Sequence, residues 1–278
     1  MMYTEDEKEI IRLVKKANPT NPIDYVRRLV KSYAREKLDN TICRCEDCPL
    51  NGKRIHSVTK GNPDTATVLI VNEGIYESQI NDDTEIVYPL ENTSEKKCID
   101  KIVEHFHVNP KHLFWINTVN CYTHVVTNGK SIYRIPNSNE VSCCQGFVDY
   151  AIEILHPVII ILLGNIPLNM FKKGEIISKV HGQWFDVHGI PAIPIISPHS
   201  LLKRKNDGTS KELLDEFSND FYYDFETAFS YIKKMIEENG IKTDFILEGE
   251  DKQWDSLKIT RRRRLLKQQN SRRRKILK

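Results

Sequence analysis

The stretch Pro157-Val-Ile-Ile-Ile-Leu-Leu-Gly164 is an apolar run of strand length that ends in a glycine. It is far shorter than the roughly 18 apolar residues that a membrane span requires. Further strands are expected at residues 67–71, 113–119, 180–187 and 193–196. Helical patterns are expected at residues 94–106, 140–155, 165–171 and 221–238. Strands that alternate with helices predict an α/β fold, with a parallel sheet covered by helices on both faces.

The carboxyl ends of these strands define the expected site of function. In an open α/β sheet, ligands bind beyond the carboxyl ends, where the loops that follow the strands meet. The four loops in question begin at Asn72, Asn117, Gly164 and Ser197. Side chains in these loops are therefore the first candidates for binding and catalysis.

Two amphipathic helices are expected ahead of the sheet. Thr4 and Glu7 have the spacing of a capping box, and Asn21-Pro22 provides a cap followed by proline in the first turn. The chain becomes polar again after the helix predicted at 221–238. The expected organisation is an N-terminal helical extension (1–42), an α/β domain (43–239), and an acidic linker with a basic, disordered tail (240–278).

The net charge of +3 conceals a strong asymmetry along the chain. Residues 261–278 contain ten Lys and Arg and no acid, whereas residues 1–260 contain 31 basic and 38 acidic residues. An acidic body with a basic arm favours binding to a polyanion such as DNA. Phosphate contacts without base specificity are expected from Arg261, Arg262, Arg263 and Arg264. The alternatives are a solvated tail or a localisation signal.

The amino terminus is polar and acidic, which is unlike a secretory signal peptide. A cytoplasmic, nucleoid-associated monomer with no membrane partner is therefore expected. The abundance of Ile, Lys and Asn suggests an AT-rich genome, such as that of a phage or its low-GC host. Seven cysteines in a reducing compartment favour metal binding, catalysis or core packing over a disulfide framework.

Four cysteines have the arrangement of a metal site. Cys45 and Cys48 form a C-x2-C pair, Cys121 follows a predicted strand, and either Cys143 or Cys144 can complete the set. Such a set fits zinc or an iron–sulfur cluster, and spacing alone does not distinguish the two. The alternative is a scatter of buried thiols.

The two remaining cysteines carry weaker expectations. Cys98 falls inside a predicted helix and is expected to pack in the core, whereas Cys43 is a substitute ligand beside the C-x2-C pair. Neither has a position in a predicted strand-end loop.

The order of the segments between residues 43 and 204 resembles the uracil-DNA glycosylase superfamily, in its iron–sulfur (family 4-like) branch. The resemblance rests on C-x2-C-x-L, an Asn-x-x-x-Cys strand end, Glu140-Val141-x-x-Cys144, His181-Gly-x-Trp and Ser197-Pro-His-Ser-Leu-Leu-Lys203. It implies a three-layer sandwich with a central, mostly parallel four-stranded sheet. It also implies a 4Fe–4S cluster (zinc being the alternative) on Cys45, Cys48, Cys121 and Cys144. The implied reaction is hydrolysis of the N-glycosidic bond of a flipped deoxyuridine.

The family motif Gly-Glu-Ala-Pro-Gly corresponds here to Asn72-Glu-Gly-Ile-Tyr76. The resemblance makes Glu73 a catalytic carboxylate, with Glu77 as a second candidate in the same loop. A family aromatic that stacks on the base is replaced by Leu90, so Tyr76 or Tyr88 would substitute for it. The alternative interpretation of each residue is a solvated loop carboxylate or a packing side chain.

Asn117 matches the family asparagine, whose amide reads the base edge by donating and accepting hydrogen bonds. The family histidine that supports the leaving base has become Ser197, so either Ser197 or His199 would supply the donor. His181 and Lys203 are candidate DNA contacts.

Three functions remain open from the sequence. The first is a DNA glycosylase that removes uracil or a related pyrimidine. The second is a catalytically weak or inactive module of the same fold that binds DNA with an unusual base, which the change at Ser197 motivates. The third is a zinc-stapled nucleic-acid protein.

Overall fold

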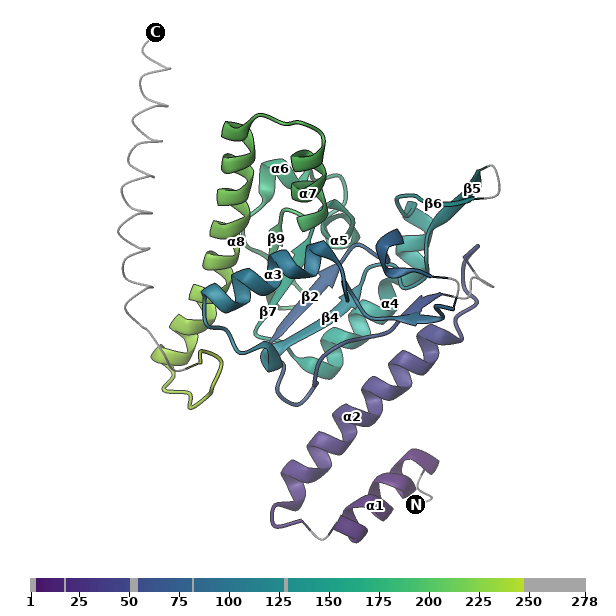
Figure 1. Cartoon of the computed structure of the whole chain (residues 1–278). Helices are drawn as coiled ribbons and strands as arrows, with labels where there is room; N and C mark the ends of the chain where they lie inside the picture. The colour runs from purple at the N-terminus through teal and green to yellow at the C-terminus, as the bar shows by residue number, and fades with distance from the viewer. Residues whose placement is uncertain (1–3, 18, 51–54, 82, 128–129, 248–278) are drawn as a thin grey trace.

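The computed structural model describes residues 4–17, 19–50, 55–81, 83–127 and 130–247, and the basic arginines of the tail lie outside them. The central sheet of the described chain has five strands in the order β4-β2-β7-β9-β8 (Figure 1). Their bounds are β2 (Val68–Asn72), β4 (Leu113–Asn117), β7 (Ile159–Leu163), β8 (Phe185–Val187) and β9 (Ile190–Ile195). The first four in spatial order are parallel, and β8 pairs antiparallel with β9.

Helices cover both faces of this sheet, which confirms the predicted three-layer α/β architecture. The helices are α1 (Glu5–Ala17), α2 (Pro22–Cys43), α3 (Ser94–His105), α4 (Ser138–Leu155), α5 (Asn165–Phe171), α6 (Ile177–Val180), α7 (Pro198–Asn206) and α8 (Lys211–Glu238). Within the part of the chain that the structure describes, no helix is long and apolar enough to cross a membrane.

Alternate residues of the central strands pack into two separate hydrophobic cores, one on each face of the sheet. Val68 and Ile70 of β2 pack with Phe225 of α8, whereas Leu69 lies in the other core with Val148 of α4. Every residue of β2, β4 and β7 is buried. This double burial explains why these strands are continuous apolar runs in the sequence rather than alternating ones.

The strand predicted at residues 180–187 is only partly correct. Residues 177–180 form α6, and the strand is limited to Phe185–Val187 at the sheet edge. Gly182 separates the two elements with a φ of +71°, a left-handed conformation that a strand does not contain. Its N–H donates to Pro194 O, so the turn is fixed against β9.

The last helix is longer than the predicted 221–238. It begins at Lys211, where Ser210 is the N-cap and accepts the Leu213 N–H. The chain after α8 then returns to the core, because Phe245 is fully buried and the Asn109 N–H donates to its carbonyl at 2.8 Å. The polar segment expected to begin at residue 240 is therefore packed on the domain as far as residue 247.

The second N-terminal helix belongs to the domain core through its carboxyl half. Leu38 and Ile42 of α2 are buried against the α4 side of the sheet. Asp39 accepts the Thr59 N–H at 2.8 Å, and Arg35 donates to Thr59 O at 2.9 Å. Figure 1 shows α1 and the amino half of α2 extending away from the sheet.

A hairpin that the sequence analysis did not predict precedes α4. It consists of β5 (His124–Thr127) and β6 (Lys130–Tyr133), and it stands out from the body in Figure 1. Arg134 follows it and donates to Glu140 Oε2 at 2.8 Å, which joins the hairpin to the first turn of α4. Glu140 is almost fully buried, and the hydrogen bonds from Arg134 hold its pKa below the usual range.

Two smaller pairings complete the fold. A short parallel pair, β1 (His56–Ser57) with β3 (Ile86–Val87), lies outside the central sheet, and η1 (Glu77–Gln79) and η2 (Pro110–His112) are single 3-10 turns. An isolated bridge joins His56 to Cys121, so the segment after the C-x2-C pair lies beside the loop after β4.

The first turn of α4 generates a stability prediction. Asn137 Oδ1 accepts the Glu140 N–H at 3.0 Å, and Glu140 Oε2 accepts the Asn137 N–H at 2.9 Å, a complete capping box. Asn137→Ala should lower the free energy of unfolding by about 1 kcal/mol, measured by urea denaturation followed by circular dichroism. Ser138→Ala, one residue along, should stay within about 0.5 kcal/mol. Equal losses in the two variants would contradict the role of the cap.

Candidate active site

The carboxyl ends of β2 and β4 place two asparagines side by side. Asn72 and Asn117 are direct partners in the parallel register, and both are 0% exposed. Asn72 Nδ2 donates to Asn117 Oδ1 and to Gly74 O, each at 3.0 Å. Asn117 Nδ2 and Asn72 Oδ1 have no hydrogen-bond partner among the described residues. The strand end therefore holds a buried donor and a buried acceptor that make no hydrogen bond to the described residues.

Glu73 follows directly after β2 and is half-buried, with its carboxyl group enclosed by the protein. Burial raises the pKa of Glu73, and this effect is partly offset by a hydrogen bond from Tyr76 and by the nearby His199. The Tyr76 hydroxyl donates to Glu73 Oε2 at 3.2 Å. A buried carboxylate with one phenolic donor is poised to interact with a positive charge that develops in front of it.

His199 is the second ionisable group of the site. It lies in the first turn of α7, and its ring stacks on Tyr76 with a centroid distance of 4.9 Å and an interplanar angle of 14°. His199 Nδ1 is 2.9 Å from Glu95 Oε1, and this hydrogen bond raises the pKa of His199. Burial opposes ionisation of Glu95, but the hydrogen bond from His199 leaves its pKa lowered. The imidazole is therefore stabilised as a cation.

Ser197 occupies the N-cap of α7 without making a side-chain capping bond. The Tyr76 phenol interacts electrostatically with Ser197, but the buried Ser197 Oγ makes no hydrogen bond of normal geometry to any described residue. Gly164 makes the close packing possible. A Cβ at Gly164 would lie 2.9 Å from Ser197 Cβ and 3.4 Å from Glu73 Oε1, and its φ of +96° also favours glycine.

The remaining predicted site residues are Tyr88, Leu90 and Glu77, and they differ in how far they are buried. Tyr88 is partly exposed and lies under the Lys60 ammonium, 5.6 Å from the ring centroid. Leu90 has a φ of +58° and is fully buried in the core that also contains Tyr76. Glu77 is exposed in η1. The structure thus brings Glu73, Asn117, Tyr76, Ser197 and His199 together, and leaves Glu77 and Tyr88 outside that group.

The predicted DNA contacts are dispersed. Lys203 is exposed on α7, one turn beyond His199. His181 Nδ1 is 2.9 Å from Asp224 Oδ2 of α8, and this bond raises the pKa of His181, whereas burial raises the pKa of Asp224. Arg261, Arg262, Arg263 and Arg264 lie outside the described residues.

Sequence reasoning missed two residues of the site. Glu95 is separated from His199 by 104 positions, and its only local signal is a carboxylate in the first turn after the Thr93 cap. Tyr133 of the hairpin packs edge-to-face on Tyr76 with ring centroids 6.1 Å apart. Burial raises its pKa, as does the nearby charge of Glu73. The alternating pattern of residues around Tyr133 is typical of a strand. This pattern does not indicate that the Tyr133 ring packs against Tyr76.

The four predicted cysteine ligands lie in one neighbourhood. Cys121 and Cys144 are buried in a small apolar cluster with Leu50 and Val119, and Cys48 packs against this cluster. Burial, together with the charges of neighbouring thiols that include Cys45 and Cys48, raises the pKa of both Cys121 and Cys144 to about 12. In the described chain, no three His, Cys, Asp or Glu side chains already form a geometry that could hold a metal ion.

The donor chemistry of this neighbourhood nevertheless fits a thiolate-bound metal. Cys121 and Cys144 are buried beside Cys48, and the neighbouring thiols, Cys45 included, oppose their ionisation, so a cationic group between them would stabilise their thiolates. Cys143 differs from its neighbour, because its Sγ points to Asp47 O at 3.3 Å. This contact engages Cys143 with the segment between Cys45 and Cys48.

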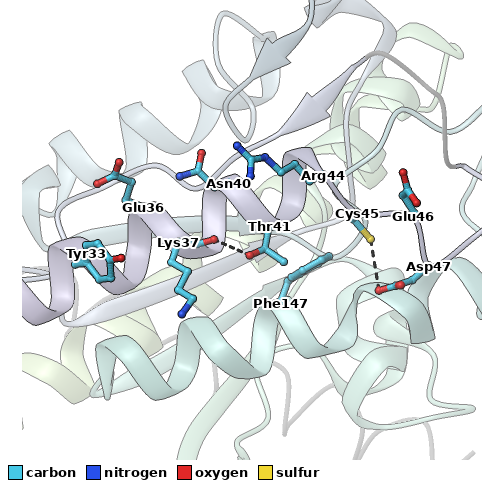
Figure 2. A pocket seen from close by; sticks show the side chains of 10 residues that line it. All are labelled: Tyr33, Glu36, Lys37, Asn40, Thr41, Arg44, Cys45, Glu46, Asp47 and Phe147. Carbon is cyan, nitrogen blue, oxygen red and sulfur yellow. Dashed lines mark hydrogen bonds between the residues drawn. The ribbon is translucent and has the colours of Figure 1, made fainter. Parts of the chain in front are cut away.

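A groove of about 640 Å³ opens beside Cys45, between α2 and Phe147 of α4 (Figure 2). Cys45 Sγ is 3.7 Å from Asp47 Oδ2 at one end of it. The side of the groove formed by α2 and its C-cap contains both acidic and basic side chains, including Glu36, Lys37 and Arg44. None of its lining residues is among the strand-end residues, so this groove is separate from the candidate active site.

Comparisons with known proteins agree with this geometry. A family model described as the uracil DNA glycosylase superfamily matches residues 60–221. The type-4 uracil-DNA glycosylase of Thermotoga maritima is 27% identical over 210 residues, 73% of this chain and 98% of that protein. A DNA polymerase of Bacillus phage SP01 is 31% identical over 83 residues, 30% of this chain and 9% of the polymerase. The chain belongs to the uracil DNA glycosylase superfamily, as a divergent member similar to its type-4 branch.

Proposed function

We propose that this protein is a DNA glycosylase that hydrolyses the N-glycosidic bond of a flipped uracil or related pyrimidine. One observation carries the proposal: Tyr76 bridges a buried carboxylate and a stabilised imidazolium at the carboxyl edge of the sheet. Its hydroxyl donates to Glu73 and its ring stacks on His199. The reaction needs these two opposite charges, because it separates a cationic sugar from an anionic base.

Glu73 would support the sugar. Cleavage of the N-glycosidic bond leaves positive charge on the deoxyribose, and a carboxylate held in a site shielded from water stabilises that charge strongly. The same oxygen atoms can orient the attacking water or accept its proton. The pKa of Glu73, raised by burial, also makes it a better base than an exposed carboxylate.

His199 and Ser197 would support the departing base. Both lie at the amino end of α7, where the helix dipole favours negative charge. The hydrogen bond to Glu95 favours the cationic form of His199, and the Ser197 hydroxyl, which lies beside the Tyr76 phenol, would donate to the base as a second group. In this way two weaker donors would replace the histidine that the family motif has at position 197.

Recognition of the base and of DNA would use separate groups. Asn117 Nδ2 is a buried donor available to a carbonyl oxygen of the base. Lys203 and the arginines 261–264 would contact phosphates, and His181 would add a further phosphate contact. The partial likeness to a phage DNA polymerase supports the expected phage origin.

A 4Fe–4S cluster would be held by Cys45, Cys48, Cys121 and Cys144. Bound there, it would brace the loop after β4 against the amino end of α4, without taking part in the hydrolysis. That loop begins at Asn117, so a fixed cluster would also hold the base-reading amide in place. Zinc is the alternative occupant.

A second candidate is a binding module with little turnover. Ser197 is a neutral donor in place of an imidazole, and the loss of one oxyanion donor costs roughly 10²- to 10³-fold in rate. Tyr76, almost fully buried, also covers Glu73. Such a module would bind DNA with an unusual base tightly and release no base.

The first prediction concerns excision. The wild-type protein should create abasic sites in uracil-containing oligonucleotides, measured by alkaline strand cleavage on single- and double-stranded substrates. Glu73→Gln should lower the rate by about 10²- to 10⁴-fold, because the variant cannot balance the sugar cation. The exposed Glu77→Gln should react at the wild-type rate. If the wild type binds these substrates but forms no abasic product, the binding module is the correct function.

The second prediction concerns pH. Rate should rise with pH as Glu73 ionises, at a pH above the usual carboxylate range, and fall at higher pH as His199 loses its proton. Glu95→Gln removes the carboxylate that stabilises the imidazolium, so the alkaline limb should move to lower pH while the acid limb stays. Single-turnover rates across pH measure both limbs. An unchanged alkaline limb in Glu95→Gln would show that His199 ionisation is not required.

The third prediction concerns the cluster. Aerobically purified protein should be brown, with broad visible absorbance and stoichiometric iron and sulfide. Cys144→Ser should lose most of this absorbance, because Cys144 is buried beside Cys121 and Cys48. Cys143→Ser is the matched control and should retain it, since Cys143 contacts Asp47 O instead. If the purified protein is colourless and contains stoichiometric zinc, the cluster assignment is wrong and the four cysteines bind zinc instead.

A further inference from the structure

The amide of Asn72 has only one orientation that its surroundings accept. It lies 3.0 Å from Gly74 O, and a backbone carbonyl oxygen can only accept a hydrogen bond. Asn72 must therefore present Nδ2 on this side. Because the same Nδ2 is 3.0 Å from the Asn117 side chain, Asn117 must in turn present its oxygen to Asn72.

These two hydrogen bonds determine which side-chain atoms of Asn72 and Asn117 are left without a partner. Asn117 Nδ2, a donor, and Asn72 Oδ1, an acceptor, are both buried and have no partner among the described residues. Buried polar atoms of folded proteins are nearly always paired, so an unpaired donor next to an unpaired acceptor indicates a polar ligand. The pair lies next to Glu73, in the loop that begins the candidate active site.

We propose that Asn72 determines the base specificity of the site, by fixing the Asn117 amide so that its N–H group faces the ligand. The ligand class selected is a 4-oxo pyrimidine, and 4-amino pyrimidines are rejected. This inference rests on the proposed function, since the ligand is the base that the glycosylase would bind. The family motif has glycine at this place, so the inferred role belongs to this chain's own residue.

The chemistry of the two base classes explains the selection. Uracil presents an acceptor, O4, beside a donor, the ring N3–H, whereas cytosine presents an amino donor beside the N3 acceptor. Asn117 Nδ2 can donate to O4, and Asn72 Oδ1 can accept from N3–H. With cytosine, two donors would face each other at one position and two acceptors at the next. A freely rotating Asn117 amide would accommodate either base.

The backbone around Asn72 is held independently of its side chain. The Thr118 N–H and the Thr118 hydroxyl both donate to Asn72 O, at 2.7 and 2.8 Å, and the Val119 N–H donates to Glu73 O at 3.3 Å. These bonds join the two strand-end loops without the amide. Removal of the amide therefore releases Asn117 while the loops stay in place, which makes the inference testable by substitution.

The experiment titrates the full-length protein with free uracil and with free cytosine, by ligand-observed NMR. The wild type should bind uracil more tightly than cytosine. Asn72→Ala should reduce the ratio of the two affinities by about 5- to 100-fold, with weaker uracil binding and stronger cytosine binding. Asn72→Ser, whose hydroxyl is too short to replace the amide, should change the ratio in the same direction and serves if the alanine variant is unstable.

Asn137→Ala is the control for a loss of stability. Asn137 caps α4, and its side chain accepts the Glu140 N–H rather than contacting either strand-end asparagine. It should retain the wild-type ratio. A fall of both affinities by the same factor in Asn72→Ala would assign Asn72 a purely structural role and overturn the inference, as would a wild type that binds the two bases equally.

Failure of the inference can be distinguished from failure of the proposed function. If the wild type excises uracil but Asn72→Ala keeps its base preference, the glycosylase stands and the role of Asn72 is wrong. If the wild type excises nothing but prefers uracil, and Asn72→Ala loses that preference, the inference holds for a binding module of the same site.

Discussion

The parallel pairing of β2 with β4 is the constraint on which the candidate site depends. It sets Asn72 directly beside Asn117 and brings the loops after four strands to one edge of the sheet. Both faces of β2, β4 and β7 are buried, so a shift of one residue in register would turn apolar side chains into the wrong core. The same packing that stabilises the fold therefore fixes the positions of the polar groups at its edge.

The candidate site holds ionisable side chains in a buried environment that disfavours their charged forms. Burial raises the pKa of Glu73, while His199 nearby and the Tyr76 hydroxyl favour its ionised form. His199 depends in turn on Glu95, which is buried at the start of α3. Neutral Tyr76 lies between Glu73 and His199, and His199 is in turn paired directly with Glu95. Each charge is stabilised by a neighbour from a different part of the chain.

The sequence was sufficient for the parallel strands of the sheet and for the residues that end them, but the expected four strands are joined by a fifth, the antiparallel β8. The apolar runs identified β2, β4 and β7, and the positions after them included Glu73, Asn117 and Ser197. Contacts between distant segments could not be predicted from the sequence, because no local pattern links Glu95 to His199 or Tyr133 to Tyr76. The edge strand β8 was also misjudged. Its boundary depends on the turn at Gly182, where a Cβ would meet Asp224 of the last helix.

Gly164 limits how this site can change over generations. Any other residue there would bring a Cβ within 2.9 Å of Ser197 and would also have to adopt a φ of +96°. Mutations at that codon therefore disturb Ser197 and Glu73 together. The side chains around Gly164 can change only within a loop that leaves no room for a Cβ at this position.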